Sequence, residues 1–407
     1  MFIICPDAGN SGVCGRARAA LYSPEMCIRD RVMYPNEPVI TVVAPLIDAQ
    51  LIETTILLEI NHQSLIATKT NRIVQAANGK PVSDFGARRA HNVDAAVYGA
   101  RAAYIGGAAG TATVLAGKMF HIPISGTMAH SWVMTFDSEY DAFKAYAESY
   151  PDGTVLLVDT YDVLKSGVPN AIRTAREVLE PMGKKLIGIR LDSGDLAYLS
   201  KEARKMLDEA GLSDCMIVAS NSLDEYTISS LNRQGAKIDS YGVGERLITS
   251  SSTPVFGAVY KLVAIQKDGK FIPKIKISET AEKITNPGIK EVYRVYDENG
   301  KAVADYLAVK GEQIRDLEPV RYVDPVNYWK NRSFVGCRFK KLQVPVFEKG
   351  KRIYDLPDIE EIRQYVKDQL ENEIWEEEQR FENAHTHYLD MSPAMFELKM
   401  SLLHEEN

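Results

Sequence analysis

The middle of the chain alternates short apolar runs with longer stretches in which apolar residues recur at helical spacing. Four runs read as buried strands separated by helical stretches: 155–158, 186–190, 216–219 and 238–241. Strands that alternate with helices predict parallel β–α units. Polar or glycine-rich residues follow each of these strands, which favours an irregular TIM-like α/β barrel over an open sheet.

The N-terminal side has a different pattern. The first 31 residues lack periodicity, are rich in arginine and carry three of the chain's five cysteines. Because the stretch 14–31 resembles a translated sequencing adapter, we leave this head out of the fold prediction as an expected artefact. Beyond it, apolar positions over 46–77 predict one long, largely buried helix, and 81–85 reads as a short strand.

The pattern changes again after Pro254. Three runs there predict antiparallel strands: 255–265, 271–277 and 292–296. A charged helix is expected from Asp358, and its acidic run at 376–378 reads as a solvated face. The barrel should therefore carry an additional antiparallel β and helical region.

Charge and cysteine content narrow the class of protein. The formal net charge of −7 at pH 7 argues against a general nucleic-acid or anionic-membrane binder. No apolar run approaches the ~20 residues of a membrane span, and no secretory signal is visible. Cys215 and Cys337 lie far apart and form no metal-binding pattern. We expect a reduced cytoplasmic protein without nucleic-acid or membrane partners.

His130 follows an apolar run that ends at Ile124, and it stands at the start of a predicted helix. A lone histidine is more often a hydrogen-bonded core residue than a catalytic one. Here several other strand ends also carry charged and glycine-rich residues, and α/β barrels keep their chemistry at the carboxyl ends of strands. His130 is therefore a candidate catalytic residue.

The run 190–195, Arg-Leu-Asp-Ser-Gly-Asp, is the most informative short motif. Asp192 and Asp195 lie three apart around a Ser-Gly turn and could bind ribose hydroxyls or Mg²⁺. Arg190 is a planar cation suited to a carboxylate or a phosphate. A capped turn with a surface ion pair would explain the same residues, because exposed ion pairs are common. Asp159, which follows the preceding strand, is another strand-end carboxylate of the same kind.

Two later strand ends offer features of a phosphate site. Gly242 and Gly244 let the backbone approach an anion closely, and the N–H groups of a following turn can hold a phosphate. A tight turn explains two glycines equally well, but the position after a late barrel strand matches where such barrels hold phosphate. Ser220 and Asn221 add hydroxyl and amide donors beside a helix start.

Taken in order, several runs resemble those of the bacterial type of the nicotinate phosphoribosyltransferase family: 84–90, 126–132, 158–162, 188–196, 219–221 and 242–244. The resemblance extends roughly from Tyr34 to the C-terminus, and together the motifs are highly specific. It implies an irregular α/β barrel, a homodimer and an enzyme that joins nicotinate to phosphoribosyl pyrophosphate. The product would be nicotinate mononucleotide for NAD salvage, with ATP hydrolysis as the driving reaction and Mg²⁺ as cofactor.

The resemblance also implies roles for individual residues. His130 would be phosphorylated by ATP, and Asp192 and Asp195 would act with it in catalysis, Asp192 holding the ribose. The other implied residues bind substrate at the nicotinate ring, its carboxylate or the phosphate: Phe85, Arg88, Thr127, Arg190, Asp159, Ser220, Asn221, Gly242 and Gly244. No metal-ligand set is assigned.

Two departures from the family pattern change the expected organisation. Glu245 stands where many relatives have a hydroxyl residue, and nothing in 1–31 matches the family's N-terminal domain, which lends a stacking tyrosine to the partner subunit. We expect a head at 1–31, a remnant of that domain and a long helix at 32–81, the barrel with the active site at 82–254, and strands returning to the flanking domain with a helical tail at 255–407. The chain as written should be poorly soluble and weakly active until such a domain is restored.

Three alternatives stay open. A nicotinamide phosphoribosyltransferase would offer an amide partner instead of a cation to the base. A phosphate-binding barrel that lacks activity because it is truncated would carry the same strand-end residues. An aldolase or isomerase would need a Schiff-base lysine at a strand end, and only Lys165 comes near such a position.

Overall fold

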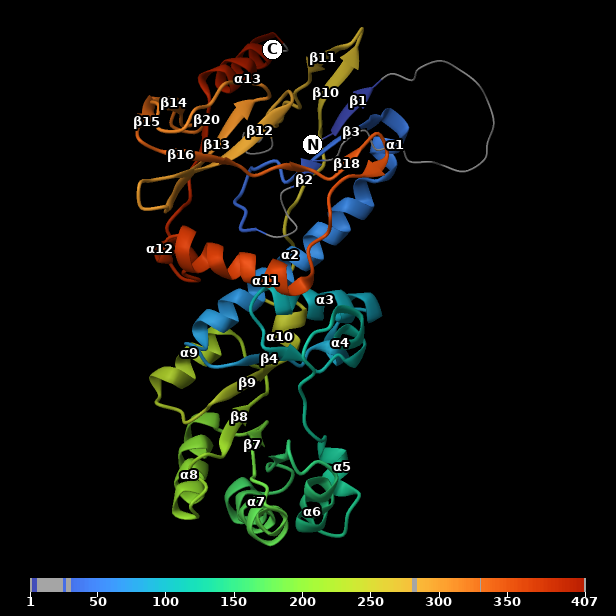
Figure 1. The fold of residues 1–407 in the computed structure, drawn as a ribbon, viewed down its shortest axis with the longest axis vertical. Coiled ribbons are helices and arrows are strands. Elements are labelled where there is room, and N and C mark those ends of the chain that lie inside the picture. The colour runs from blue at the N-terminus through green and yellow to red at the C-terminus, as the bar shows by residue number, and fades with distance from the viewer. Residues whose placement is uncertain (1, 6–24, 27–30, 280–283, 330, 406–407) are drawn as a thin grey trace, which may run out of the picture. The chain divides into compact units, whose positions relative to one another are not determined.

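The computed structural model describes residues 2–5, 25–26, 31–279, 284–329 and 331–405 (Figure 1). The chain divides into two compact units. One consists of His62–Phe256, and the other joins Met1–Asn61 with Gly257–Asn407. Each unit is built around its own sheet or sheets.

The unit His62–Phe256 is built on a curled sheet of parallel strands that forms half of a barrel, in the order β5-β4-β9-β8-β7-β6. The strands are β4 (Val82–Asp84), β5 (Gly110–Thr111), β6 (Val155–Leu157), β7 (Gly188–Leu191), β8 (Met216–Ala219) and β9 (Ser240–Val243). Most of their apolar side chains are buried because a parallel sheet is covered on both faces, although Met216 at the start of β8 is exposed. The predicted α/β fold of the TIM-like type is confirmed.

Helices connect these strands, as the alternating pattern predicted. They are α3 (Val93–Ile105), α4 (Val114–Phe120), α5 (His130–Met134), α6 (Glu139–Ser149), α7 (Val168–Thr174), α8 (Leu196–Glu209), α9 (Glu225–Arg233) and α10 (Glu245–Ile248). Helix α8 begins directly after Asp195, which caps it, and Asp224 is the N-cap of α9.

Two predictions of element bounds are corrected by backbone contacts. The helix expected over 46–77 is divided into α1 (Leu46–Leu51) and α2 (Glu53–Ala76). Ile52 between them is the C-cap of α1, and its N–H bonds to the carbonyl of Gln50. Strand β9 starts two residues later than expected and includes Gly242, which pairs with Ser83 of β4. The Gly-Val-Gly run therefore ends a strand instead of forming a turn.

The other unit contains two six-stranded sheets, in the orders β11-β10-β1-β3-β2-β17 and β15-β14-β20-β13-β12-β16. The first sheet is formed by β1 (Phe2–Cys5), β2 (Glu25–Met26), β3 (Ile40–Pro45), β10 (Leu262–Lys267), β11 (Lys270–Pro273) and β17 (Val344–Pro345). Strand β1 pairs in parallel with β3 and β10, although the head was left out of the fold prediction. Residues 6–24 and 27–30 of that head lie outside the described residues.

Of the three antiparallel strands expected after Pro254, the second sheet contains the one at 292–296, whereas the other two correspond to β10 and β11 of the first sheet. It is formed by β12 (Lys290–Tyr296), β13 (Ala302–Val309), β14 (Val320–Val323), β15 (Asn331–Phe334), β16 (Arg338–Lys341) and β20 (Leu389–Met391). A separate pair joins β18 (Phe347–Glu348) to β19 (Lys351–Arg352). The run 255–265 was expected to be strand throughout, but β10 begins only at Leu262, since an apolar run forms a strand only where a partner strand pairs with it.

The C-terminal segment contains α11 (Ile359–Asp368), α12 (Glu376–Gln379) and α13 (Pro393–Glu405). The charged helix expected from Asp358 starts there, with Asp358 and Glu361 forming a capping box. It does not continue through the acidic run, because Ile374 and Trp375 are extended and the run belongs to the separate helix α12. The acidic run was predicted to be solvated, and this is wrong for Glu378, whose side chain is only 5% exposed. It accepts hydrogen bonds from the Tyr34 hydroxyl at 2.8 Å and the Nδ1 side of His387 at 3.0 Å.

A buried ion pair lies next to that contact. The Arg294 guanidinium donates from Nε and Nη2 to the two carboxylate oxygens of Asp305, at 3.0 and 2.9 Å. Nε2 of His387 is 3.4 Å from Asp305, and its ring stacks on Tyr34 with 3.7 Å between centroids. Such a pair is costly to break because either charge would be left buried alone.

No helix among the described residues combines the length and the apolar character that crossing a membrane requires. Cys215 and Cys337 are buried free thiols.

Candidate active site

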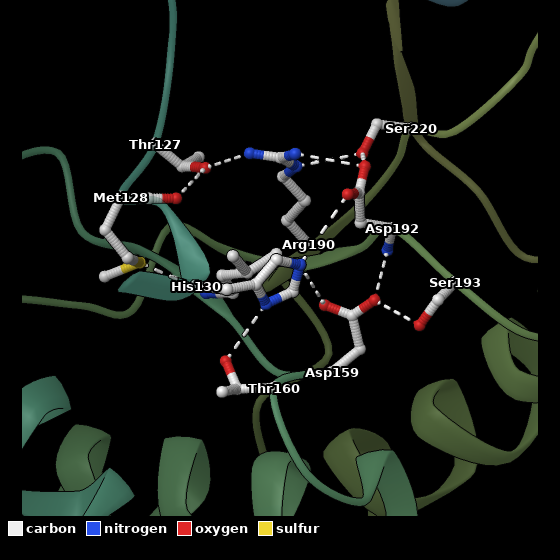
Figure 2. A network of polar contacts seen from close by, with 10 residues as sticks. Thr127, Met128, His130, Asp159, Thr160, Arg190, Asp192, Ser193 and Ser220 are labelled. Carbon is white, nitrogen blue, oxygen red and sulfur yellow. Dashed lines mark hydrogen bonds and ion pairs between the residues drawn. The ribbon is translucent and has the colours of Figure 1, made fainter. Parts of the chain in front are cut away.

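Three neighbouring strand ends and one helix start bring polar side chains together at one edge of the parallel sheet (Figure 2). Arg190 belongs to β7, Asp159 and Ser220 follow β6 and β8, and His130 is the first residue of α5. The carboxyl ends of parallel strands meet at one edge, so residues far apart in sequence become neighbours. This is where the sequence predicted the chemistry.

The guanidinium of Arg190 is the centre of this network. Its Nε donates to the Ser220 hydroxyl at 2.9 Å, its Nη1 to the Thr127 hydroxyl at 2.7 Å, and its Nη2 to Oδ1 of Asp192 at 3.0 Å. A guanidinium has five N–H donors, of which these bonds use three. Within the described part of the chain, one N–H on each terminal nitrogen is therefore left for a ligand.

The ring of Phe85 lies beside this cation. The guanidinium carbon of Arg190 is 5.5 Å from the ring centroid, within the range of a cation–π contact. Gly242 packs directly against the ring, and a Cβ there would come within 2.4 Å of it. The glycine thus serves to seat the aromatic ring, a role that the sequence did not predict.

Asp84 supports the turn that carries Phe85. The side chain is buried, and its two oxygens accept hydrogen bonds from the Gly86 N–H at 2.8 Å and the Thr111 hydroxyl at 2.7 Å. Burial raises the pKa of Asp84 despite these two bonds. Asp84 therefore fixes the backbone of the turn and does not itself reach the network around Arg190.

His130 lies between a hydroxyl and two carboxylates. Its Nδ1 is 3.2 Å from the Thr160 hydroxyl, and its Nε2 is 3.8 Å from Oδ1 of Asp159 and 3.7 Å from Oδ2 of Asp192. The side chain is 41% exposed, so a ligand can reach it from solvent. Figure 2 shows the ring between Thr160 on one side and Asp159 and Asp192 on the other, an arrangement in which its neighbours orient the imidazole.

The two carboxylates next to His130 have different partners. Oδ2 of Asp159 accepts from the Asp192 backbone N–H at 3.0 Å and from the Ser193 hydroxyl at 2.6 Å. Oδ1 of Asp159 is buried and has no hydrogen-bond partner among the described residues. Burial alone would raise the pKa of Asp192, but the Ser220 hydroxyl, the Arg190 guanidinium and the His130 ring together hold it below its usual range. Asp192 is thus ionised at neutral pH.

The loop after β8 has an unusual backbone. Asn221 and Ser222 have φ angles of 88° and 42°, which non-glycine residues rarely adopt. Asp224 accepts from the Thr227 N–H at 2.8 Å and forms an ion pair with Arg246 of α10. This pair joins the loop after β8 to the segment after β9, and so fixes the two strand ends predicted to hold phosphate.

Several predicted site residues lie outside the network around Arg190. Asp195 caps α8 by accepting from the Tyr198 N–H at 3.0 Å, and Arg88 and Asn221 are exposed. A Cβ on Gly244 would come within 3.1 Å of the Phe85 carbonyl oxygen, so this glycine lies close to the backbone of the Phe85 turn. The structure thus gathers Phe85, Thr127, His130, Asp159, Arg190, Asp192, Ser220 and Gly242 but leaves the other four at its margin.

Two contacts explain residues that the sequence left undecided. Glu245 pairs with Arg89 at 3.5 Å on the surface. Lys165 is 87% exposed and pairs with Asp162 at 3.4 Å, so it is not placed as a Schiff-base lysine at the sheet edge.

Thr160 and Ser193 are site residues to which the sequence analysis gave no role. Thr160 directly follows Asp159, and Ser193 directly follows Asp192, at the same strand ends. The sequence could have indicated them, because each is a hydroxyl residue next to a carboxylate at a strand end. Whether such a hydroxyl points into the site depends on the local backbone, which the sequence does not give.

The half-barrel and its strand-end network define an α/β-barrel enzyme that binds an anionic small molecule. Two protein-family models match this chain and identify the family within that class. One described as the "Nicotinate phosphoribosyltransferase (NAPRTase) family" matches residues 81–300, and one described as "Nicotinate phosphoribosyltransferase C-terminal domain" matches residues 289–399. The chain belongs to the nicotinate phosphoribosyltransferase family, whose place is in NAD biosynthesis.

Individual relatives agree with this assignment. The chain is 49% identical over 375 residues to nicotinate phosphoribosyltransferase of Bacillus subtilis (strain 168), a match that covers 92% of this chain and 76% of that protein. It is 37% identical to nicotinate phosphoribosyltransferase of Dictyostelium discoideum, with 90% and 70% covered. The crystal structure of human nicotinic acid phosphoribosyltransferase matches with a TM-score of 0.83 at 25% identity, covering 94% of this chain and 83% of that one.

Proposed function

We propose that this chain transfers a phosphoribosyl group from phosphoribosyl pyrophosphate to nicotinate. The observation that carries the proposal is the position of Arg190 beside Phe85. The two remaining N–H groups of Arg190 match the two oxygens of a carboxylate, and the Phe85 ring offers an aromatic face to a pyridine ring. A neutral amide would leave the Arg190 cation without a charged partner, which favours nicotinate over nicotinamide.

The transfer forms a bond between ribose C1 and the nicotinate nitrogen while the bond from C1 to the pyrophosphate oxygen breaks. Departure of pyrophosphate leaves positive charge on C1 and the ring oxygen, as in glycoside cleavage. The ionised carboxylate of Asp192 stabilises that charge. Its neighbours Ser220 and Arg190 hold it in one orientation before the reaction starts.

We propose His130 as the residue that couples ATP to this transfer. An imidazole nitrogen attacks the γ-phosphorus of ATP, a new N–P bond forms, and ADP leaves. Phosphorylation places about two negative charges beside Asp159 and Asp192, and the repulsion moves the segments that carry them. The half-exposed ring and its two neighbouring carboxylates support this role.

The carboxylates next to His130 also fit Mg²⁺. Mg²⁺ takes oxygen ligands and is usually bound by one or two carboxylates together with substrate phosphates. Asp159 and Asp192 would hold it, and the unpartnered buried Oδ1 of Asp159 supports this assignment. Among the described residues no cluster of three or more such ligands is formed. When bound, Mg²⁺ would neutralise charge on the departing pyrophosphate.

We propose a homodimer as the assembled form. The support is a group of exposed apolar side chains on α4 and the segment after it: Val114, Leu115, Met119 and Ile124. Exposed apolar patches mark surfaces that bind other proteins. Sedimentation velocity of the full chain should show a dimer that Leu115→Asp weakens, whereas a monomer for both would contradict the proposal.

The direct test of the activity is release of pyrophosphate from phosphoribosyl pyrophosphate. We expect release to require nicotinate and to be stimulated by ATP. Nicotinamide at the same concentration should support much less release. Equal use of the two bases would contradict the assignment of Arg190, and no release with either base would contradict the proposed activity.

A further inference from the structure

Ser220 is predicted by sequence to line a phosphate pocket, and in the structure its hydroxyl is bonded to two side chains of the site. The residue is 3% exposed, and its backbone N–H donates to the Leu191 carbonyl at 2.9 Å, which fixes its position beside β7. Its hydroxyl accepts from Nε of Arg190 and donates to Oδ1 of Asp192 (Figure 2). The hydroxyl therefore lies inside the Arg190–Asp192 pair.

This position determines which edge of the guanidinium a ligand can use. Ser220 and Asp192 are bonded to each other and together occupy Nε and one N–H of Nη2. Thr127 holds one N–H of Nη1 from the other side. The free N–H groups are then on the two terminal nitrogens, which is the arrangement that a bidentate carboxylate needs.

Removing the Ser220 hydroxyl would leave Nε of Arg190 without its hydrogen-bond acceptor. Arg190 would keep Thr127 and Asp192 at its terminal nitrogens, but its Nε would lose its acceptor in a buried place. The guanidinium plane could then turn relative to Phe85. A carboxylate depends on the orientation of that plane much more than a neutral amide or a phosphate does, because two parallel bonds must form at once.

We infer that Ser220 is a positioning residue that sets the selectivity for nicotinate through Arg190, and that it does not hold the phosphate. The inference rests on the proposed function, in which Arg190 binds the nicotinate carboxylate. It assigns Ser220 to the base half of the site and leaves Gly244 and the loop joined by Asp224 and Arg246 to the phosphate half.

The test compares Ser220→Ala, Ser220→Cys and Ser220→Thr in the full chain, with Ser230→Ala on α9 as a matched control that loses only an exposed bond to Gln234. Calorimetric titration with nicotinate, nicotinamide and phosphoribosyl pyrophosphate gives each affinity, and steady-state kinetics gives the KM values. Ser220→Ala should weaken nicotinate binding about tenfold, the usual effect of losing a hydrogen bond to a charged group. Phosphoribosyl pyrophosphate binding should change less than about threefold, since Asp192 keeps Arg190 as a partner.

The two other variants separate positioning from folding. Ser220→Thr keeps the hydroxyl and should restore most of the nicotinate affinity, while Ser220→Cys keeps the size but has a weak donor and should behave like Ser220→Ala. The ratio of nicotinate to nicotinamide affinity should fall in the Ala and Cys variants only.

Other outcomes overturn the inference. A Ser220→Ala protein that loses affinity for phosphoribosyl pyrophosphate but not for nicotinate would place Ser220 in the phosphate pocket. Unchanged affinities would show that the Ser220 hydroxyl positions nothing. If the unmodified chain binds phosphoribosyl pyrophosphate but no nicotinate, the proposed function fails as well, which distinguishes the two failures.

Discussion

The Nδ1 atom of His130 lies 3.2 Å from the hydroxyl oxygen of Thr160. On the other side of the ring, Nε2 faces Asp159 and Asp192. The imidazole therefore has polar partners at both nitrogens and is held in one orientation. A nucleophile held in its reactive orientation avoids the entropy cost of reaching it during the reaction.

Thr160→Val removes the hydroxyl but keeps the shape of the side chain. We expect the rate of His130 phosphorylation by ATP to fall about tenfold, because a hydrogen bond that orients the ring is lost. Thr160→Ser should restore the rate. Transfer of label from γ-labelled ATP, followed over time, measures this. Equal rates in Thr160→Val and the unmodified chain would show that Asp159 and Asp192 orient the ring unaided.

His130→Ala should abolish the phosphoryl label altogether. In the unmodified chain the label should be acid-labile and base-stable, as a phosphohistidine is. Because ATP acts only as a coupling agent in the proposed function, the variant should retain slow transfer that ATP does not stimulate. His404→Ala, in the last turn of α13, is the matched control and should label normally. A His130→Ala protein that labels equally would place the phosphoryl group on another residue.

Arg190→Lys keeps the positive charge but loses the planar fork. A lysine ammonium cannot replace the bonds to Ser220, Thr127 and Asp192 together with two parallel bonds to a carboxylate. We expect the KM for nicotinate to rise at least about tenfold, since charge-assisted bidentate pairs are roughly twice as strong as neutral bonds. The KM for nicotinamide should change less. An unchanged KM for nicotinate would mean that the carboxylate binds elsewhere.

The sequence predicted a parallel α/β barrel because the runs that form β6, β7, β8 and β9 are short, mostly apolar and followed by polar or glycine-rich residues. Strand β5, Gly110–Thr111, has no apolar run and was not predicted. It also placed Thr127, Arg190 and Asp192 at strand ends that proved to be neighbours. Adjacent carboxyl ends follow from parallel pairing alone, so the proximity of these residues needs no detailed coordinates. The alternation of apolar and polar residues was enough for this part of the site.

The roles of Ser220, Asp195 and Gly242 could not be predicted in the same way. Each depends on a side-chain direction or a register that tertiary contacts decide. Asp195 became a helix cap because its oxygen reaches the Tyr198 N–H, and Gly242 became part of β9 because it pairs with Ser83. The observed β9 is shifted by two residues from the predicted strand. Such a shift leaves the same residues on the buried face but changes which residue ends the strand.

Gly242→Ala tests the contact between β9 and Phe85. The added Cβ would come within 2.4 Å of the ring, so the ring must shift from its present position beside Arg190. Overpacking of this kind costs about 1–3 kcal/mol of stability, and nicotinate should bind more weakly. Gly153→Ala is a suitable control because a Cβ there meets no atom within 4 Å. Denaturation in urea and nicotinate titration measure the two effects. If Gly242→Ala kept full nicotinate affinity, the Phe85 ring would not be part of the base site.

The buried contacts of His387 predict how stability depends on pH. Burial alone would lower the pKa of His387, but hydrogen bonds and charges from Asp305 and Glu378 raise it above its ordinary 6.5. A group whose folded-state pKa is raised binds protons more tightly in the folded protein. Its contribution is therefore complete below pH 6.5, the unfolded value, and is lost as pH rises through the folded-state pKa.

We therefore expect the difference in free energy of unfolding between the unmodified chain and His387→Gln to be largest near pH 6 and to shrink as pH rises above 6.5. The difference is the right quantity because other groups titrate nearby. Burial raises the pKa of Asp390 to about 6, so its contribution to stability is lost as pH rises towards 6. Burial lowers the pKa of Lys290 to about 7, so its contribution grows as pH rises above 7. Urea denaturation followed by circular dichroism at pH 6, 7, 8 and 9 measures the difference. A difference that stayed constant over this range would mean that His387 carries no excess charge in the folded protein.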